Sequence, residues 1–169
     1  MTDTYIALYS TGQRGKYHWQ LVFPTSSGGA LGHTGLVFQV RLKEVWVTEH
    51  YDCMNLLEDP TFLCVVRLPP VSDPIKAQQI AAGEDPGQRD TPLLWTHSQA
   101  GLGWSCAQWI IRILRTYIAE GIMTDSLTAG AKDKGANFYL QICGLGAKAE
   151  DDEGAGQTED GVWVLWWNT

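Results

Sequence analysis

The sequence predicts an α+β fold, in which helices pack on one face of an antiparallel sheet. The first half of the chain, up to residue 68, holds short apolar or alternating segments that are separated by turn signals, a pattern typical of strands and hairpins. The second half holds an amphipathic segment from Cys106 to about Glu120, as expected of a helix on a core. A hydrophobic content of 44%, with eight Trp and six Tyr, excludes a disordered chain and indicates a compact globule.

Five strands are expected in the first half, and they follow one another closely enough to form an antiparallel set. They cover residues 4–10, 17–23, 35–42, 45–50 and 62–68. The second strand alternates, so its Tyr17, Trp19, Leu21 and Phe23 side chains share one face. His18 and Gln20 then take the opposite face. Residues 35–42 are interpreted as the return strand of a hairpin with this second strand.

The helix that begins at Cys106 has the clearest start signal in the chain. Ser105 followed three residues later by Gln108 has the form of a capping box, in which a hydroxyl and an amide satisfy the first unpaired N–H groups of a helix. Arg112 and Arg115 lie on the polar side of this helix, opposite its apolar stripe.

Two further helices are expected on weaker signals. Residues 74–82 form a short helix that Asp73 caps. Residues 126–142 form another, although Gly130 and Gly135 interrupt the pattern.

The chain is interpreted as one domain with two C-terminal additions. Residues 1–148 form the single α+β domain. Residues 149–161 are acidic and contain glycine, so we expect them to stay mobile. Residues 162–169 are strongly aromatic and are expected to form a last strand or a tail folded on the core. The alternative is an exposed anchor for a partner, including a second copy of this chain.

Charge and composition exclude several classes of partner. A net charge of −7 and a pI near 4.9 argue against nucleic-acid binding, which requires clustered Lys and Arg. No apolar run approaches the roughly 20 residues that span a bilayer, and the N-terminus lacks the features of a secretory signal. The four cysteines are therefore interpreted as free thiols of a cytoplasmic protein.

We expect neither a cofactor nor a metal. The nearest metal-like pattern is His50 followed by Cys53, and no second ligand pair follows it at a zinc-like interval.

Cys106 is the best candidate for chemistry. At the mouth of a helix its sulfur faces the positive end of the helix dipole, which favours thiolate over thiol. The neighbouring Trp104 and Trp109 indicate the wall of a pocket. We expect substrate to contact these two residues together with Trp19, Ser105 and Gln108, which favours an apolar or aromatic substrate.

A nucleophilic cysteine needs a base, and the base needs an orienting group. His18 can serve as the base if the cysteine helix packs on its face of the second strand. Gln39, on the return strand, can accept the imidazole N–H and fix its tautomer. His33 is a rival for this third place, at the loop end of the hairpin.

Two of these motifs resemble those of the lecithin:retinol acyltransferase and NlpC/P60 superfamily. Residues 17–23 (YHWQLVF) are similar to its His-Trp-apolar strand, and residues 104–109 (WSCAQW) to its helix-opening cysteine motif. The order of His before Cys matches its circularly permuted, papain-like branch. A closer resemblance is to a family of uncharacterised fungal proteins with a Tyr-His-Trp strand, a central Trp-x-x-x-Glu segment and a Trp-Asn-Cys helix start.

The resemblance spans residues 5–121. Residues 46–49 roughly fit the central segment, and residues 62–71 fit the strand that follows. There are two departures. Gln39 stands where the acyltransferase branch has a second His, and Ser105 stands where Asn is common.

The resemblance implies a permuted papain-like fold and a cysteine-dependent hydrolase or acyltransferase of specialised metabolism. Cys106, His18 and Gln39 would be catalytic, through a thiolate and a thioester, on a small, partly apolar molecule or a peptide. One alternative is a binding module of the same fold that has lost its chemistry. Another is a small biosynthetic cyclase or lyase, in which His18 is the acid/base and Cys106 only shapes the pocket.

Overall fold

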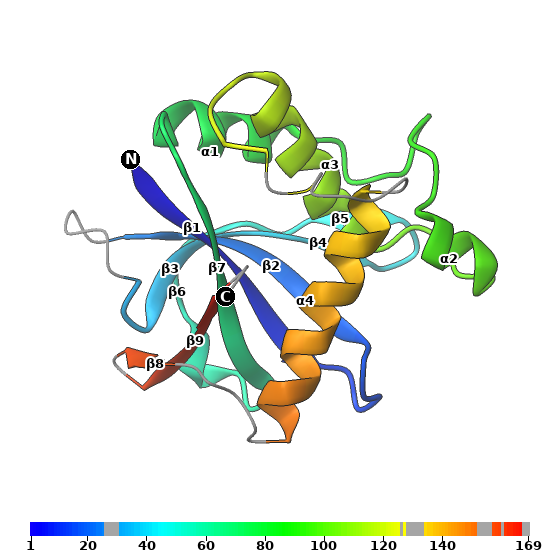
Figure 1. The fold of residues 1–169 in the computed structure, drawn as a ribbon. Helices are drawn as coiled ribbons and strands as arrows, with labels where there is room; N and C mark the ends of the chain where they lie inside the picture. The colour runs from blue at the N-terminus through cyan, green and yellow to red at the C-terminus, as the bar shows by residue number, and fades with distance from the viewer. Residues whose placement is uncertain (26–30, 126, 128–133, 152–156, 160, 167–169) are drawn as a thin grey trace.

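The computed structural model of the chain describes residues 1–25, 31–125, 127, 134–151, 157–159 and 161–166. Within these residues the fold combines a mainly antiparallel seven-stranded sheet with helices, which confirms the predicted α+β class. The sheet order is β6-β3-β2-β1-β7-β9-β8 (Figure 1). Every neighbouring pair is antiparallel except β7 and β9, which run parallel.

The strands of this sheet are β1 (Thr2–Ser10), β2 (Tyr17–Pro24), β3 (Thr34–Phe38), β6 (Tyr51–Asn55), β7 (Phe62–Val71), β8 (Gln157–Glu159) and β9 (Val162–Trp166). A separate two-stranded hairpin is formed by β4 (Val40–Leu42) and β5 (Trp46–Thr48). The predicted strand over residues 45–50 is thus shorter than expected. β6 was not expected, because its segment is polar and largely exposed at the edge of the sheet.

The expected return strand over residues 35–42 is broken at Gln39. β3 pairs with β2 only along residues 21–24 of β2. The backbone of Gln39 then bonds elsewhere: its carbonyl accepts the N–H of Glu49 at 3.0 Å, and its N–H donates to His50 Nδ1 at 3.3 Å. Because these bonds replace a ladder with β2, the edge of β2 before residue 21 stays open.

The helices are α1 (Pro74–Gly83), α2 (Trp95–Gln99), α3 (Cys106–Ala119) and α4 (Lys134–Glu150), with a single 3₁₀ turn η1 (Leu56–Glu58). α1 begins as predicted, with Asp73 accepting the N–H of Lys76. The helix predicted over residues 126–142 overlaps α4 along residues 134–142, and α4 continues to Glu150. Residue 127 is not helical, and residues 126 and 128–133 lie outside the described residues. No helix in the described part of the chain is long and apolar enough to cross a membrane.

Gly135, which counted against a helix at this place, lies inside α4. A Cβ there would lie 2.6 Å from the Arg115 guanidinium and 2.7 Å from Leu94. A glycine thus permits α4 to pack closely against its neighbours at the cost of helix propensity.

The helices cover one face of the sheet. α3 lies against β2, and α4 lies against β7 (Figure 1). Residues of α1, α3 and α4 share the main core with one face of β1, β2 and β7, which includes Trp19. The other face forms a second core with Tyr9, Val37 and the 3₁₀ residue Leu56. α3 therefore packs on the Trp19 face of β2, not on the His18 face as expected.

The aromatic C-terminus enters the sheet as β9, between β7 and β8. Val162, Val164 and Leu165 are buried, and the Arg67 guanidinium lies 4.4 Å from the centre of the Trp166 ring. The acidic segment expected to be mobile over residues 149–161 is partly ordered, since α4 ends at Glu150 and β8 spans Gln157–Glu159. Its residues 152–156 and 160, like residues 167–169, lie outside the described residues.

Candidate active site

Cys106 is the first residue of α3, and Ser105 caps this helix. Ser105 Oγ accepts the backbone N–H of Gln108 at 3.3 Å, which is one half of the expected capping box. The Gln108 side chain does not complete the box. Its Oε1 accepts the N–H of Leu94 at 2.8 Å, and its Nε2 donates to the carbonyl of Gly103 at 3.0 Å. Gln108 is buried by these contacts, so it holds the segment before α3 in place and does not line the pocket described below.

The Cys106 sulfur lies at the open edge of β2. It accepts the backbone N–H of Trp19 at 3.4 Å, and Trp19 directly follows His18 in the strand. The N–H groups of Cys106 itself and of Ala107 also face the sulfur. The sulfur is thus held at the edge of β2, against the backbone of the residue after His18, and the His18 ring is not among the residues that line the pocket beside Cys106. A β3 that continued along β2 would occupy the place of the sulfur.

His18 is bonded to Gln39, the partner suggested by the sequence. His18 Nε2 donates to Gln39 Oε1 at 2.7 Å, and the same oxygen accepts the side-chain N–H of Gln20 at 2.9 Å. A carbonyl oxygen only accepts, so this geometry assigns the proton of the neutral imidazole to Nε2. Nδ1 is then the nitrogen free to take up a proton. The rival partner, His33, is exposed in the turn before β3.

Gln39 is rigidly held, as an orienting residue must be. It is fully buried, and its backbone bonds to both Glu49 and His50. The His50 ring in turn stacks on Trp109 of α3, with centroids 6.2 Å apart and planes inclined by 26°. The helix that carries Cys106 therefore also supports the residue that orients His18.

Burial sets the charge state of both groups. Burial lowers the pKa of His18 below its ordinary value, although the hydrogen bond to Gln39 acts in the opposite direction. Burial also raises the pKa of the Cys106 thiol, against the smaller effect of the three backbone N–H groups around it. The resting pair is thus a neutral imidazole and a neutral thiol. The helix start alone does not produce the thiolate that the sequence led us to expect.

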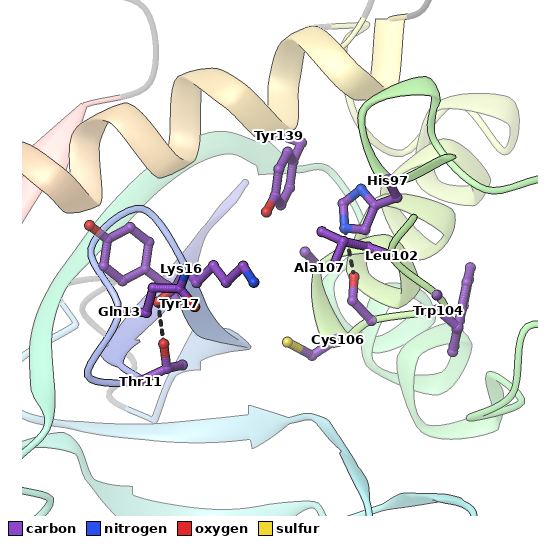
Figure 2. A pocket seen from close by; sticks show the side chains of 12 residues that line it. Thr11, Gln13, Lys16, Tyr17, His97, Leu102, Trp104, Cys106, Ala107 and Tyr139 are labelled. Carbon is purple, nitrogen blue, oxygen red and sulfur yellow. Dashed lines mark hydrogen bonds between the residues drawn. The ribbon is translucent and has the colours of Figure 1, made fainter. Parts of the chain in front are cut away.

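A pocket of about 450 Å³ opens beside Cys106 (Figure 2). Its wall combines the β1–β2 turn with residues from α2 to the start of α3 and from α4. The lining residues are Thr11, Gln13, Lys16, Tyr17, His97, Leu102, Gly103, Trp104, Ser105, Cys106, Ala107 and Tyr139. The volume fits a small molecule or the end of a larger one. The wall combines polar groups of the β1–β2 turn with the rings of Tyr17, Trp104 and Tyr139.

Of the three tryptophans expected to contact substrate, Trp104 alone lines the pocket. Its ring lies beneath the Arg112 guanidinium, 4.7 Å from it. Trp19 is fully buried and stacks on Tyr139, with centroids 5.7 Å apart and planes at 17°. Trp109 is buried in the core beneath α3. These two tryptophans support the wall from behind, which corrects our expectation.

His97 is a pocket residue that the sequence did not reveal. It lies in the short helix α2 and is 3% exposed, with Nε2 3.3 Å from Ser105 Oγ. Its ring packs edge-on against Tyr139, with centroids 4.6 Å apart, and burial lowers its pKa. Five helical residues without a side-chain cap leave little signal in a sequence, so nothing marked this position.

Within the described residues there is no group of three or more His, Cys, Asp or Glu side chains placed to hold a metal ion. His50, from the His-x-x-Cys pattern, uses Nδ1 to accept the N–H of Gln39.

Comparison of the chain with protein-family models, curated proteins and solved structures finds no match in any of the three. The chemistry open to the site follows from its own geometry.

Proposed function

We propose that the protein is a cysteine-dependent hydrolase or acyltransferase of a permuted papain-like fold, with Cys106 as nucleophile, His18 as base and Gln39 as orienting residue. One observation carries the proposal. The Cys106 sulfur accepts a hydrogen bond from the N–H of Trp19 at 3.4 Å, and the adjacent His18 donates a hydrogen bond from Nε2 to Gln39 Oε1 at 2.7 Å. An amide on the imidazole, and a thiol held against the backbone beside it, support an order of groups like that of the Cys-His-Asn enzymes.

The first step is attack of the Cys106 sulfur on an acyl carbonyl. The thiol proton moves to Nδ1 of His18, and the sulfur forms a bond to the carbonyl carbon. The N–H groups of Cys106 and Ala107, which face the sulfur, are placed to stabilise the developing oxyanion. Collapse of the adduct breaks the bond to the leaving group, which takes the proton from His18, and a thioester remains.

The second step resolves the thioester. Water or an amine gives a proton to His18 and attacks the thioester carbonyl, and the thiol returns with that proton. Burial raises the pKa of Cys106 and lowers that of His18, so the charged thiolate–imidazolium pair is disfavoured. The proton therefore moves at the same time as the attack, both when the thiol attacks the substrate and when water or an amine attacks the thioester.

The raised pKa of Cys106 also favours a second candidate, a binding module of the same fold in which the thiol is inert. A buried cysteine without an activating base behaves as a small apolar residue. The two candidates differ in whether His18 changes the reactivity of Cys106.

The test is the rate of Cys106 alkylation by iodoacetamide from pH 5 to 10, read by mass spectrometry. If His18 is the base, alkylation persists below the ordinary thiol pKa of about 8.5 and declines only where His18 becomes protonated, below about pH 6.5. In His18→Ala this neutral-pH reaction disappears and labelling rises only at alkaline pH, with the raised pKa of the thiol.

Cys53 is exposed and serves as the reference thiol within the same sample. Cys106→Ser identifies the labelled peptide and should abolish turnover of thioester substrates. A Cys106 profile that is the same with and without His18 would exclude the cysteine-dependent enzyme and favour the binding module.

A further inference from the structure

The charge of the pocket is carried by one side chain. Among the described residues that line it, Lys16 is the only charged one, and neither Asp nor Glu is present. This is unusual in a chain whose net charge is −7. The exposed Lys16 ammonium thus offers the pocket a positively charged group, with no carboxylate among the described lining residues.

Lys16 also differs from most cations of the molecule in having no ion pair within the described part of the chain. The side chains that do pair with a carboxylate are Arg14, Arg41, Lys43, Arg67, Lys76, Arg89 and Arg112. Two carboxylates that contact residues of the β1–β2 turn and the start of β2 bond to other side chains. Glu150 accepts the hydroxyl of Tyr17 at 2.8 Å, and Asp151 binds Arg14.

The position of Lys16 suits a ligand that also reaches Cys106. The turn between β1 and β2 holds its backbone, because the N–H of Lys16 donates to Gln13 at 3.0 Å and its carbonyl accepts Thr11 Oγ1 at 2.7 Å. Figure 2 shows its amino group pointing into the space that Tyr139, His97 and Cys106 surround. The ammonium and the sulfur therefore face one cavity of about 450 Å³ from two sides.

We propose that the acyl substrate is anionic, and that Lys16 binds its carboxylate or similar group while Cys106 attacks the acyl carbonyl. This inference rests on the proposed function and adds the substrate class to it. Thr11 and Gln13 add polar groups to the lining, and Leu102 and Trp104 supply apolar wall. The ligand is thus a small acyl compound with an acidic end, not a purely apolar molecule.

The test compares iodoacetate with iodoacetamide, two alkylating agents of similar size that differ in charge. Second-order rate constants at Cys106 are measured by mass spectrometry at pH 8.5 and low ionic strength, with exposed Cys53 as internal reference. We expect the iodoacetate-to-iodoacetamide ratio at Cys106 to exceed that at Cys53. Lys16→Met should lower the Cys106 ratio by about three- to tenfold, as expected for one charge near the reacting atoms.

Two variants control this experiment. Lys16→Arg keeps the charge and should keep the ratio, whereas Lys148→Met removes an exposed lysine outside the pocket and should leave it unchanged. An unchanged ratio in Lys16→Met would overturn the inference. Failure of the proposed function is a separate outcome: the rate of Cys106 alkylation by iodoacetamide would then be the same in the unmodified chain and in His18→Ala.

Discussion

Gln39 decides which nitrogen of His18 carries the proton. Its Oε1 accepts both His18 Nε2 and Gln20 Nε2, and its backbone is fixed by residues 49–50. The amide is uncharged, so it orients the imidazole without strongly favouring the imidazolium form. A carboxylate at the same place would change this balance.

Gln39→Glu should raise the pKa of His18, because a negative charge 2.7 Å from Nε2 favours the protonated ring. The acid limb of Cys106 alkylation by iodoacetamide should then move to higher pH by about one to two units. Gln39→Met is the matched control, since it removes the acceptor without adding charge and should lower the neutral-pH rate without moving the limb upward. A limb that stays in place in Gln39→Glu would show that this amide does not act on the base.

At the scale of the elements, the break between β3 and β4 creates the site. It leaves the edge of β2 open for Cys106, and it directs the Gln39 side chain to His18. Alternation along residues 35–42 predicted one strand, because both pieces are apolar enough to continue it. The bonds from Gln39 to Glu49 and His50 close the β4–β5 hairpin, which begins directly after Gln39, and the alternation along residues 35–42 carries no signal for that closure.

Features that depend on neighbouring residues in the sequence, such as helix starts, were predicted correctly. The caps Asp73 and Ser105 and the apolar stripe of α3 placed two helix starts correctly. The functions of Trp19 and Trp109 could not be assigned in this way, because a tryptophan beside a site and one beneath it have the same sequence pattern. Their burial depends on how Tyr139 and the core pack around them.

Arg112 fixes the loop that precedes α2. We expected it on the solvent side of α3, but its guanidinium pairs with Glu84 and donates to the carbonyls of Gly87 and Gln88, each at 3.0 Å. Because the pair is mostly buried, Arg112→Ala should lower the free energy of unfolding by about 2–4 kcal/mol. Arg89→Ala, which breaks an exposed pair in the same loop, should lower the free energy of unfolding far less, because water screens that pair.

Urea unfolding followed by tryptophan fluorescence measures both variants. Equal midpoints for Arg112→Ala and Arg89→Ala would contradict the structural role assigned to Arg112. A selective loss in Arg112→Ala should also affect the pocket, because the guanidinium covers the ring of Trp104.

For the molecule as a whole, three histidines link stability to pH, of which His97 is buried and His18 and His50 are partly buried. Burial lowers the pKa of His18, His50 and His97 in the folded state. As pH falls below about 6.5, the unfolded chain therefore binds protons that the folded chain does not. The stabilisation is complete above this pH and is lost as the pH falls towards the lowered values.

Below about pH 6.5 the free energy of unfolding should therefore fall with decreasing pH, and each histidine that stays neutral in the folded chain adds at most about 1.4 kcal/mol per pH unit to the slope. Carboxylates with lowered pKa values, such as Glu49 and Asp59, add their effect only at lower pH.

Urea unfolding at pH 7.5, 6 and 5 measures the slope of the free energy of unfolding against pH. His50→Asn keeps an acceptor for the Gln39 N–H and should remove the contribution of the His50 proton from the slope of unfolding free energy against pH. Equal stability at pH 7.5 and 5 in the unmodified chain would mean that these rings become protonated without unfolding, and that His18 is not held neutral in the way the proposed reaction requires.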